Sequence, residues 1–405
     1  MRIFVISCLI CMGLWAKSYI ISPLPLPKQE IINLEVGSCD KRCLNKLYDE
    51  GLYFSFIGRF QDEQDSDLRA KLTLALQELS ILDIPPSVSN GNLAKVKLAL
   101  LMPKKVIGRY FSESIDIILS YLMTRGGDFS FEVFNTDTED TQAIQQAYER
   151  AIDAQSDFVI GIFTTKGAME LATNIKISVP VYLPTINIHQ LNITKTPKHL
   201  YFGGVDYESQ IELLVNLAQG EKIVAYNDNS PTGQYLGSLL RTKNVDIIYE
   251  QNIDSTTAKR FSSILKQQEP YLQSNVVMFN TSGARTGLIL SQMLISNAKP
   301  KKMFSTQVNY DSALLNSVHS TDKQELYVVN VISNINPRLL EYASLLGRDL
   351  KYNWVSYATA IGVELLLGDQ LSEQERFFSE RFLDNQVNYI NKIYKFSGKR
   401  FDEYR

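Results

Sequence analysis

The chain has 405 residues, of which 45% are hydrophobic and 21% are charged. This length exceeds that of a usual single hydrophobic core, so we expect two or three compact units, and the composition argues against extensive disorder. Lys plus Arg (41) and Asp plus Glu (44) leave a formal charge of -3. Without a long basic run, this balance argues against a nucleic-acid-binding protein.

The first residues predict a secretory signal peptide. Met1-Arg2 is a short basic start, residues 3–15 are apolar, and Ala16 is a small residue suited to a cleavage site. An uncleaved membrane anchor is the alternative, but it normally needs a longer apolar run. Too little apolar sequence precedes Cys8 for a lipoprotein site. We therefore expect residues 1–16 to be removed near Ala16, giving a periplasmic protein without stable membrane insertion.

The next segments predict a tether and a helical hairpin. Residues 17–36 carry Pro23, Pro25 and Pro27 between leucines, which favours an extended tether. Across residues 37–90, leucine and phenylalanine recur at helical spacing on both sides of a polar break, which predicts two packed helices. This hairpin either caps the following domain or docks an envelope protein partner.

Two cysteines remain once the signal peptide is removed. Cys39 and Cys43 are spaced so that both thiols lie on one helix face, and an oxidising compartment favours a disulfide between them. Metal binding is a competing interpretation, but it lacks partners because the chain has only three histidines and no C-x-x-C-H haem motif. Two free buried thiols are the third possibility. We predict a structural disulfide, no metal site and no cofactor.

From residue 93 onward, strand-like and helix-like segments alternate with short connections, as in a parallel sheet covered by helices. The first run, residues 93–219, predicts strands at 96–102, 129–134, 158–163 and 179–183, a short strand and turn at 199–206, and helices at 112–124, 141–154 and 207–218. The second run, residues 220–334, predicts strands at 222–226, 245–249, 302–306 and 326–331 and helices at 232–242 and 256–269. A buried helical stretch follows within residues 335–370, and residues 371–405 predict a charged helix at 372–384 and a short hairpin.

One element occurs in both runs. Residues 157–172 (DFVIGIFTTKGAMELA) read as a buried strand, a polar turn and a helix, and residues 275–293 (NVVMFNTSGARTGLILSQM) repeat this order. The two turns align over 163–168 and 279–284, sharing Phe, Thr, Gly and Ala. If each turn lies at the carboxyl end of a parallel strand in its own lobe, the two turns can face a shared crevice.

The order of these segments resembles the type I periplasmic binding protein fold, the family of branched-chain amino-acid binding proteins and their relatives. The resemblance spans about residues 93–370 and rests on segments 95–103 (KVKLALLMP), 161–172, 179–185, 201–210, 223–237 and 354–367. It implies an α/β protein with two lobes, 93–219 and 220–334, each a parallel sheet flanked by helices, with 335–370 returning to the first lobe. Outer-membrane activators of penicillin-binding proteins add a helical region in front of this fold, in a place similar to that of residues 37–90.

Binding is better supported than catalysis. The sequence has no G-x-S-x-G elbow, H-E-x-x-H pair, Walker loop or G-x-G-x-x-G turn, so no catalytic residue and no enzyme activity are predicted. Hydroxyls and free N–H groups at a helix start can hold a small anion, although many such residues are ordinary helix caps. The candidate ligand-binding residues lie at the predicted strand ends of both lobes: Thr164, Thr165, Thr185, Asn187, Asn227, Asp228, Thr281 and Ser282.

We therefore expect a periplasmic, non-catalytic protein that holds a small anionic or zwitterionic ligand between its lobes. The alternative is a cell-envelope scaffold or regulator with a degenerate cleft that acts through protein contacts. Tyr207, Tyr226 and Tyr310 are further candidates for a ligand wall, with core packing as the alternative for each.

Overall fold

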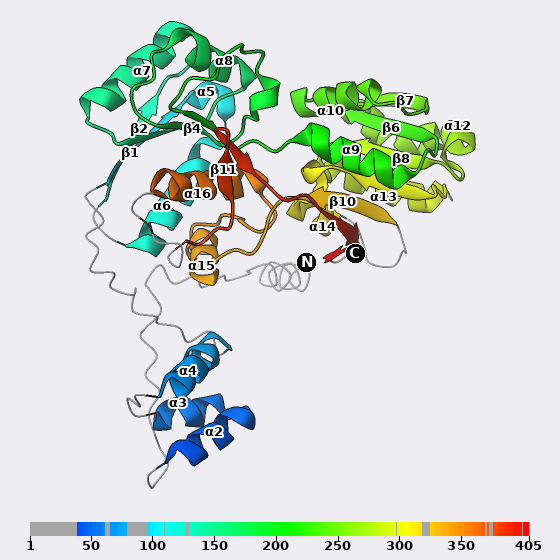
Figure 1. Cartoon of the computed structure of the whole chain (residues 1–405). Helices are drawn as coiled ribbons and strands as arrows, with labels where there is room; N and C mark the ends of the chain where they lie inside the picture. The colour runs from blue at the N-terminus through cyan, green and yellow to red at the C-terminus, as the bar shows by residue number, and fades with distance from the viewer. Residues whose placement is uncertain are drawn as a thin grey trace, which may run out of the picture. The chain divides into compact units, whose positions relative to one another are not determined.

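The computed structural model describes residues 39–60, 65–78, 96–108, 110–126, 129–296, 298–317, 325–368, 371, 376–398 and 400–404. Contacts divide the chain into two compact units, residues 1–92 and 93–405 (Figure 1). The predicted signal peptide, the tether of residues 17–36 and the linker before residue 96 lie outside the described residues. Within the described part of the chain, no helix is long and apolar enough to span a membrane.

The first unit contains three short helices where the sequence predicts a hairpin of two. They are α2 (Lys41–Asp49), α3 (Tyr53–Arg59) and α4 (Ser66–Glu78). Gly51 has a φ of 72°, a conformation that favours glycine, and it turns the chain between α2 and α3. Leu44, Phe56 and Leu68, one from each helix, form a small core. Cys39 and Cys43 form the predicted disulfide at the start of α2.

The second unit contains two seven-stranded sheets, and the two-lobed α/β fold predicted from the sequence is confirmed. The first sheet has the order β11-β12-β5-β4-β3-β1-β2, and only the β11–β12 pair is antiparallel. Its strands are β1 (Val96–Met102), β2 (Phe129–Asn135), β3 (Phe158–Gly161), β4 (Val181–Leu183), β5 (Leu200–Phe202), β11 (Arg381–Leu383) and β12 (Gln386–Asn388).

Helices cover both faces of the first sheet because its central strands are apolar on both sides. Leu98, Leu100 and Met102 of β1 pack toward one set of helices, whereas Ala99 and Leu101 pack toward the other. The first set is α6 (Tyr110–Arg125), α15 (Pro337–Leu345) and α16 (Trp354–Leu366), and the second is α7 (Thr141–Asp153) and α8 (Thr165–Asn174). The short helices α5 (Lys104–Ile107) and η2 (Ile188–Gln190) lie in connections.

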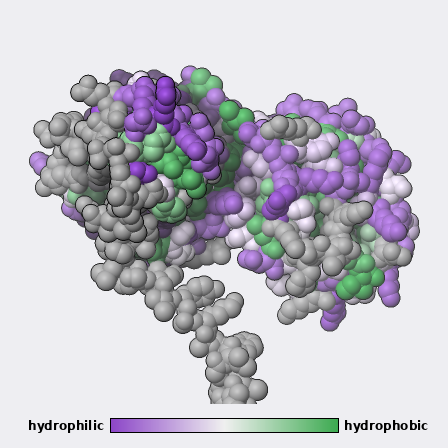
Figure 2. Space-filling view, turned by 90° about the horizontal axis from the view of Figure 1, so that it is seen from below, coloured by the Kyte–Doolittle hydropathy of each residue, from purple (hydrophilic) through white to green (hydrophobic). Residues whose placement is uncertain are grey.

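The second sheet has the order β14-β13-β10-β9-β8-β6-β7. Its strands are β6 (Ile223–Asp228), β7 (Ile247–Ile253), β8 (Val276–Asn280), β9 (Lys302–Ser305), β10 (Leu326–Asn330), β13 (Lys392–Phe396) and β14 (Phe401–Glu403). Its helices are α9 (Tyr207–Ala218), α10 (Pro231–Thr242), α11 (Ser255–Lys259), α12 (Phe261–Leu272), α13 (Gly283–Ser296), η3 (Gln307–Asn309) and α14 (Ser312–Ser317). In the space-filling view, the visible face of each lobe mixes hydrophilic and hydrophobic residues (Figure 2).

Helix α9 belongs to the second lobe, which corrects the predicted boundary between residues 219 and 220. Its buried residues Ile211 and Leu214 share a core with Ile223 and Ala225 of β6. The chain therefore first crosses between the lobes just before α9, at residues 203–206. It crosses back between β10 and α15, and a third time between β12 and β13.

The charged helix predicted at 372–384 is wrong for the residues that the structure describes in this stretch. Residues 376–380 have no helix, and β11 and β12 form an antiparallel pair instead. Asp384 and Asn385 have φ values of 48° and 67°, as in a two-residue hairpin turn, and these residue types adopt that conformation readily. The predicted C-terminal hairpin corresponds to β13 and β14, which pair antiparallel.

Candidate functional site

All eight candidate residues lie where a parallel strand ends or just beyond it. In the first lobe, Thr164 and Thr165 join β3 to α8, and Thr185 and Asn187 follow β4. In the second lobe, Asn227 and Asp228 end β6, and Thr281 and Ser282 join β8 to α13. Because β3 and β4 are neighbours, as are β6 and β8, the structure gathers one group of four at the carboxyl edge of each sheet.

In the first lobe, the start of α8 holds an internal carboxylate. The backbone N–H of Thr164 donates to Oε1 of Glu139 at 2.6 Å, and its hydroxyl donates to Oε2. Glu139 is only 5% exposed, and a Cβ built on Gly167 would lie 2.8 Å from its Oε1, so α8 is shaped around this carboxylate. A negative charge is favourable at a helix N-terminus, where N–H groups point outward. Glu139 was missed by the sequence analysis, because its partner lies 25 residues away and no motif links them.

The other candidates of the first lobe differ in their exposure. The side chains of Thr165 and the adjacent Lys166 are exposed at the first turn of α8. The hydroxyl of Thr185 donates to the carbonyl of Phe163 at 3.1 Å. Asn187 is buried, caps η2 and donates to the carbonyl of Gly204 at 3.1 Å, so its side chain is used to fix the first crossing. Thr165 and Lys166 therefore offer the more accessible polar groups.

The second lobe repeats the arrangement of an internal carboxylate at a helix start. Asp228 is 2% exposed, and its Oδ2 accepts from the backbone N–H of Ser282 at 3.0 Å and pairs with Nη1 of Arg285 at 3.2 Å. Its Oδ1 accepts from the backbone N–H and the hydroxyl of Ser230. Ser282 is exposed, and the side chain of Arg285 is 27% exposed. These two residues are the accessible polar groups of this turn.

Asn227 and Thr281 are buried within the second lobe. Asn227 donates to Glu250 at 2.6 Å and accepts from Asn280 at 2.8 Å. The Thr281 hydroxyl shares a hydrogen bond with that of Thr286 at 2.7 Å. Both candidates therefore use their side chains to hold neighbouring strands and helices together.

Of the three candidate tyrosines, Tyr207 lies where the lobes meet. It begins α9, and its ring makes an edge contact with Trp354 at the start of α16 in the first lobe, with 6.4 Å between ring centroids. Burial, and then the nearby phenols of Tyr110 and Tyr235, raise the pKa of Tyr207 above its ordinary value. Tyr226 instead donates to Gln268 in the core, and Tyr310 packs against Tyr352 and Phe401.

No protein-family model and no curated protein sequence matches this chain. Solved structures do. A branched-chain amino acid ABC transporter protein from Thermus thermophilus with bound valine is 14% identical, with a TM-score of 0.56, over 77% of this chain and 96% of that one. An ABC transporter substrate-binding protein from Sphaerobacter thermophilus is 11% identical, with a TM-score of 0.58, over 76% and 96%. Haemophilus influenzae LpoA is 12% identical, with a TM-score of 0.51, over 90% of this chain and 72% of LpoA.

These similarities show that residues 93–405 have the type I periplasmic binding protein fold that the sequence resembles. At 10 to 14% sequence identity, these similarities show the fold of this chain but do not identify its ligand. The match to LpoA covers a larger share of the chain than the second unit supplies, so it extends into the helical first unit.

Proposed function

We propose that this protein is an exported, non-catalytic binding protein that holds a small zwitterionic ligand between its two lobes. The observation that carries the proposal is the repeated turn: each lobe presents a hydroxyl and a basic side chain in a turn whose backbone N–H donates to a buried carboxylate. In the first lobe these are Thr165, Lys166 and Glu139. In the second lobe the corresponding groups are Ser282, Arg285 and Asp228.

The buried carboxylates favour a zwitterion over a simple anion. The N–H and hydroxyl of Thr164, which would otherwise receive an anion, already donate to Glu139. A second negative charge brought to that turn would meet the carboxylate of Glu139. A ligand that carries both signs can place its ammonium toward Glu139 or Asp228 and its carboxylate toward Lys166 or Arg285. Two of the similar structures hold such molecules, valine and leucine.

Ligand exchange requires the lobes to separate and close. The connections at residues 203–206, 331–336 and 389–391 are the segments about which the lobes can rotate. Trp354 contacts Tyr207 of the other lobe, so its surroundings change when the lobes move. The chain has only one other tryptophan, Trp15, which lies in the predicted signal peptide. Tryptophan fluorescence of the mature chain, excited selectively over its tyrosines, therefore reports on Trp354 alone.

The test is a titration of the mature protein with neutral amino acids, with basic and acidic amino acids, and with dicarboxylates lacking an amine. We expect heat of binding and a change in Trp354 fluorescence for an amino acid and for none of the simple dicarboxylates. Thr165→Ala and Ser282→Ala should each weaken binding, whereas Glu149→Ala, an exposed change elsewhere on the first lobe, should not. The proposal would be overturned if no amino acid gave a heat of binding or a change in Trp354 fluorescence. N-terminal sequencing of the secreted chain, expected to begin at Lys17, tests export.

A second candidate function is an envelope regulator that acts through a protein partner. The specific observation in its favour is the match to LpoA, which extends beyond the two-lobed unit. Co-purification from envelope extracts, with the full mature chain and with a chain lacking residues 37–90, separates the two functions. A partner that depends on those residues, together with a silent amino-acid titration, favours the regulator.

A further inference from the structure

Strand β2 is an edge of the first sheet, and no other described strand pairs with its outer side. Proteins usually shorten, bulge or cover edge strands, because an exposed row of backbone N–H and C=O groups pairs readily with another strand. Of the four edge strands in the described sheets, β11 and β14 have three residues each, and the pairing of β7 is interrupted by a register shift. Strand β2 has seven residues and pairs with β1 residue for residue, so it is long and regular.

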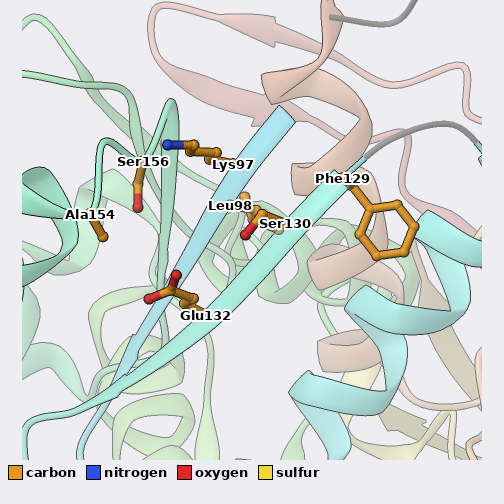
Figure 3. Close-up of a pocket in the computed structure, with 7 residues that line it drawn as sticks. All are labelled: Lys97, Leu98, Phe129, Ser130, Glu132, Ala154 and Ser156. Carbon is orange, nitrogen blue, oxygen red and sulfur yellow. The ribbon is translucent and has the colours of Figure 1, made fainter. Parts of the chain in front are cut away.

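Over residues 129–133 of β2, apolar side chains on one face alternate with polar side chains on the other, and Phe134 then packs against the core on the side of Ser130 and Glu132. Phe129 and Phe131 pack against the core beside α6, and Val133 follows on the same face with 38% exposure. Ser130 and Glu132 point to the other face, toward the end of α7 (Figure 3). No proline or lysine interrupts the strand. This pattern suits an added strand with apolar residues on one side and polar residues on the other.

A hollow of about 360 Å³ adjoins the polar face of β2. Its polar lining includes Lys97 on β1, Ser130 and Glu132 on β2, and Ser156 after α7 (Figure 3). The ammonium of Lys97 donates to Gln155 at 3.1 Å. Glu132 is exposed and forms no ion pair with any described residue. The hollow therefore holds one cation, Lys97, and one carboxylate, Glu132, and the carboxylate has no ion-pair partner among the described residues.

We propose that β2 docks an extended segment of a partner protein, which adds a strand to the sheet and places a basic side chain in the hollow against Glu132. The backbone edge supplies affinity, and Glu132 supplies selectivity for Lys or Arg. A second copy of this chain fits less well: Glu132 is the central residue of β2, so two-fold antiparallel pairing over the whole strand would set it opposite itself, and like charges in that position repel. This edge is distinct from the strand ends that form the candidate ligand site.

The probes are three labelled peptides, each as long as β2, in which valine alternates with threonine around a central residue. The first has a central lysine, the second a central glutamate, and the third has the central lysine with N-methyl groups on alternate amides of one edge. Fluorescence anisotropy with the full mature chain should show that the lysine peptide binds about fivefold or more tightly than the glutamate peptide. The N-methylated peptide should not bind, because it cannot pair with the strand edge.

Glu132→Lys should reverse the preference between the lysine and glutamate peptides, whereas Glu149→Lys, an exposed charge reversal on α7, should leave it unchanged. Circular dichroism of both variants checks that they fold. The proposal is overturned if the wild type and Glu132→Lys bind the two peptides alike, or if N-methylation has no effect. It is also overturned if sedimentation shows a dimer that Val133→Lys dissociates, since a second copy would then cover β2.

Discussion

The carboxylate of Glu139 accepts both the backbone N–H and the hydroxyl hydrogen of Thr164 at the start of α8. Asp228 makes the matching contact with the N–H of Ser282 at the start of α13. In both lobes, therefore, a carboxylate from elsewhere in the lobe, in the loop after β2 or at the end of β6, accepts from the start of the helix that follows the repeated turn. The protein carries its own anion at each place where the sequence suggested an external one.

Removal of the Glu139 carboxylate should expose an anion site. We expect Glu139→Ala to lower the free energy of unfolding by about 1–3 kcal/mol, because two donors of Thr164 lose their partner. Acetate or formate should restore part of this loss, since either can enter the space that the side chain leaves. Urea unfolding with and without sodium acetate, against sodium chloride at equal ionic strength, measures the rescue. Glu149→Ala should show neither the loss nor the rescue, and an acetate effect equal in wild type and Glu139→Ala would contradict the interpretation.

Long segments with a clear hydrophobic pattern could be predicted from the sequence. Strand β1 and helix α9 lie at the predicted residues, because their side-chain spacing and end signals agree. The lobe to which α9 belongs could not be predicted from the sequence. Both lobes have an apolar core, and the apolar face of α9 could pack against either one. Only the packing of Ile211 against Ile223 in the structure decides it.

The positions of the candidate residues in the fold could be predicted, whereas the hydrogen-bond partners of their side chains could not. Thr164, Asp228 and Ser282 lie at strand ends as expected, since strand–turn–helix order fixes where polar turn residues fall. Their partners are set by tertiary structure, as Glu139 reaches Thr164 from the loop after β2, which no local pattern reveals. Asn187 is a candidate ligand-binding residue in the sequence, yet its side chain is buried and donates to the carbonyl of Gly204.

The buried pair of Arg125 and Glu364 should be far more important for stability than a surface pair. Glu364 accepts from Nη2 of Arg125 at 2.7 Å, from the Tyr121 hydroxyl at 3.1 Å, and from the backbone N–H groups of Phe377 and Phe378. Glu364→Ala leaves these donors and a buried positive charge without their acceptor, and we expect a loss of about 3–5 kcal/mol. Urea unfolding measures it.

The matched control for Glu364 is Glu403→Ala, which breaks the exposed pair of Lys392 and Glu403. Exposed ion pairs contribute at most about 1 kcal/mol, so this variant should unfold nearly as the wild type does. If Glu364→Ala and Glu403→Ala lowered the free energy of unfolding equally, solvent would have to reach Glu364 in solution.

Alkaline pH should unfold the second unit through its buried tyrosines. Burial raises the pKa of Tyr182, Tyr226 and Tyr357 well above their ordinary value, and Glu380 adds to the shift of Tyr357. A pKa raised in the folded state contributes stability that is complete below the unfolded pKa of about 10 and is lost as pH rises above it. Parallel absorbance and circular dichroism titrations should show exposed tyrosines ionising first and the buried ones only as structure is lost. Ionisation of all 21 tyrosines in one step near pH 10, with the fold intact, would contradict this expectation.

The first crossing between the lobes should tolerate no side chain at Gly203. The ring of Tyr182 lies between Gly203 and Gly362, and a Cβ on Gly203 would stand 1.8 Å from its hydroxyl oxygen. That hydroxyl donates to the carbonyl of Ala358 at 2.8 Å, and the hydroxyl of Tyr389 donates to the carbonyl of Gly203 at 2.8 Å, so the ring cannot move without breaking contacts at the crossings.

We expect Gly203→Ala to destabilise the protein by about 2 kcal/mol or more through this overlap. Gly368→Ala is the control, because among the described residues its Cβ would meet only Arg376, at 3.5 Å, an ordinary contact. Adding Tyr182→Phe to Gly203→Ala removes the hydroxyl that overlaps most, so the double variant should lose less than the sum of the two single losses. If the stability losses of the two single variants add up to that of the double variant in thermal unfolding, Tyr182 does not restrict the side chain at position 203. The first crossing would then be less tightly packed than the structure indicates.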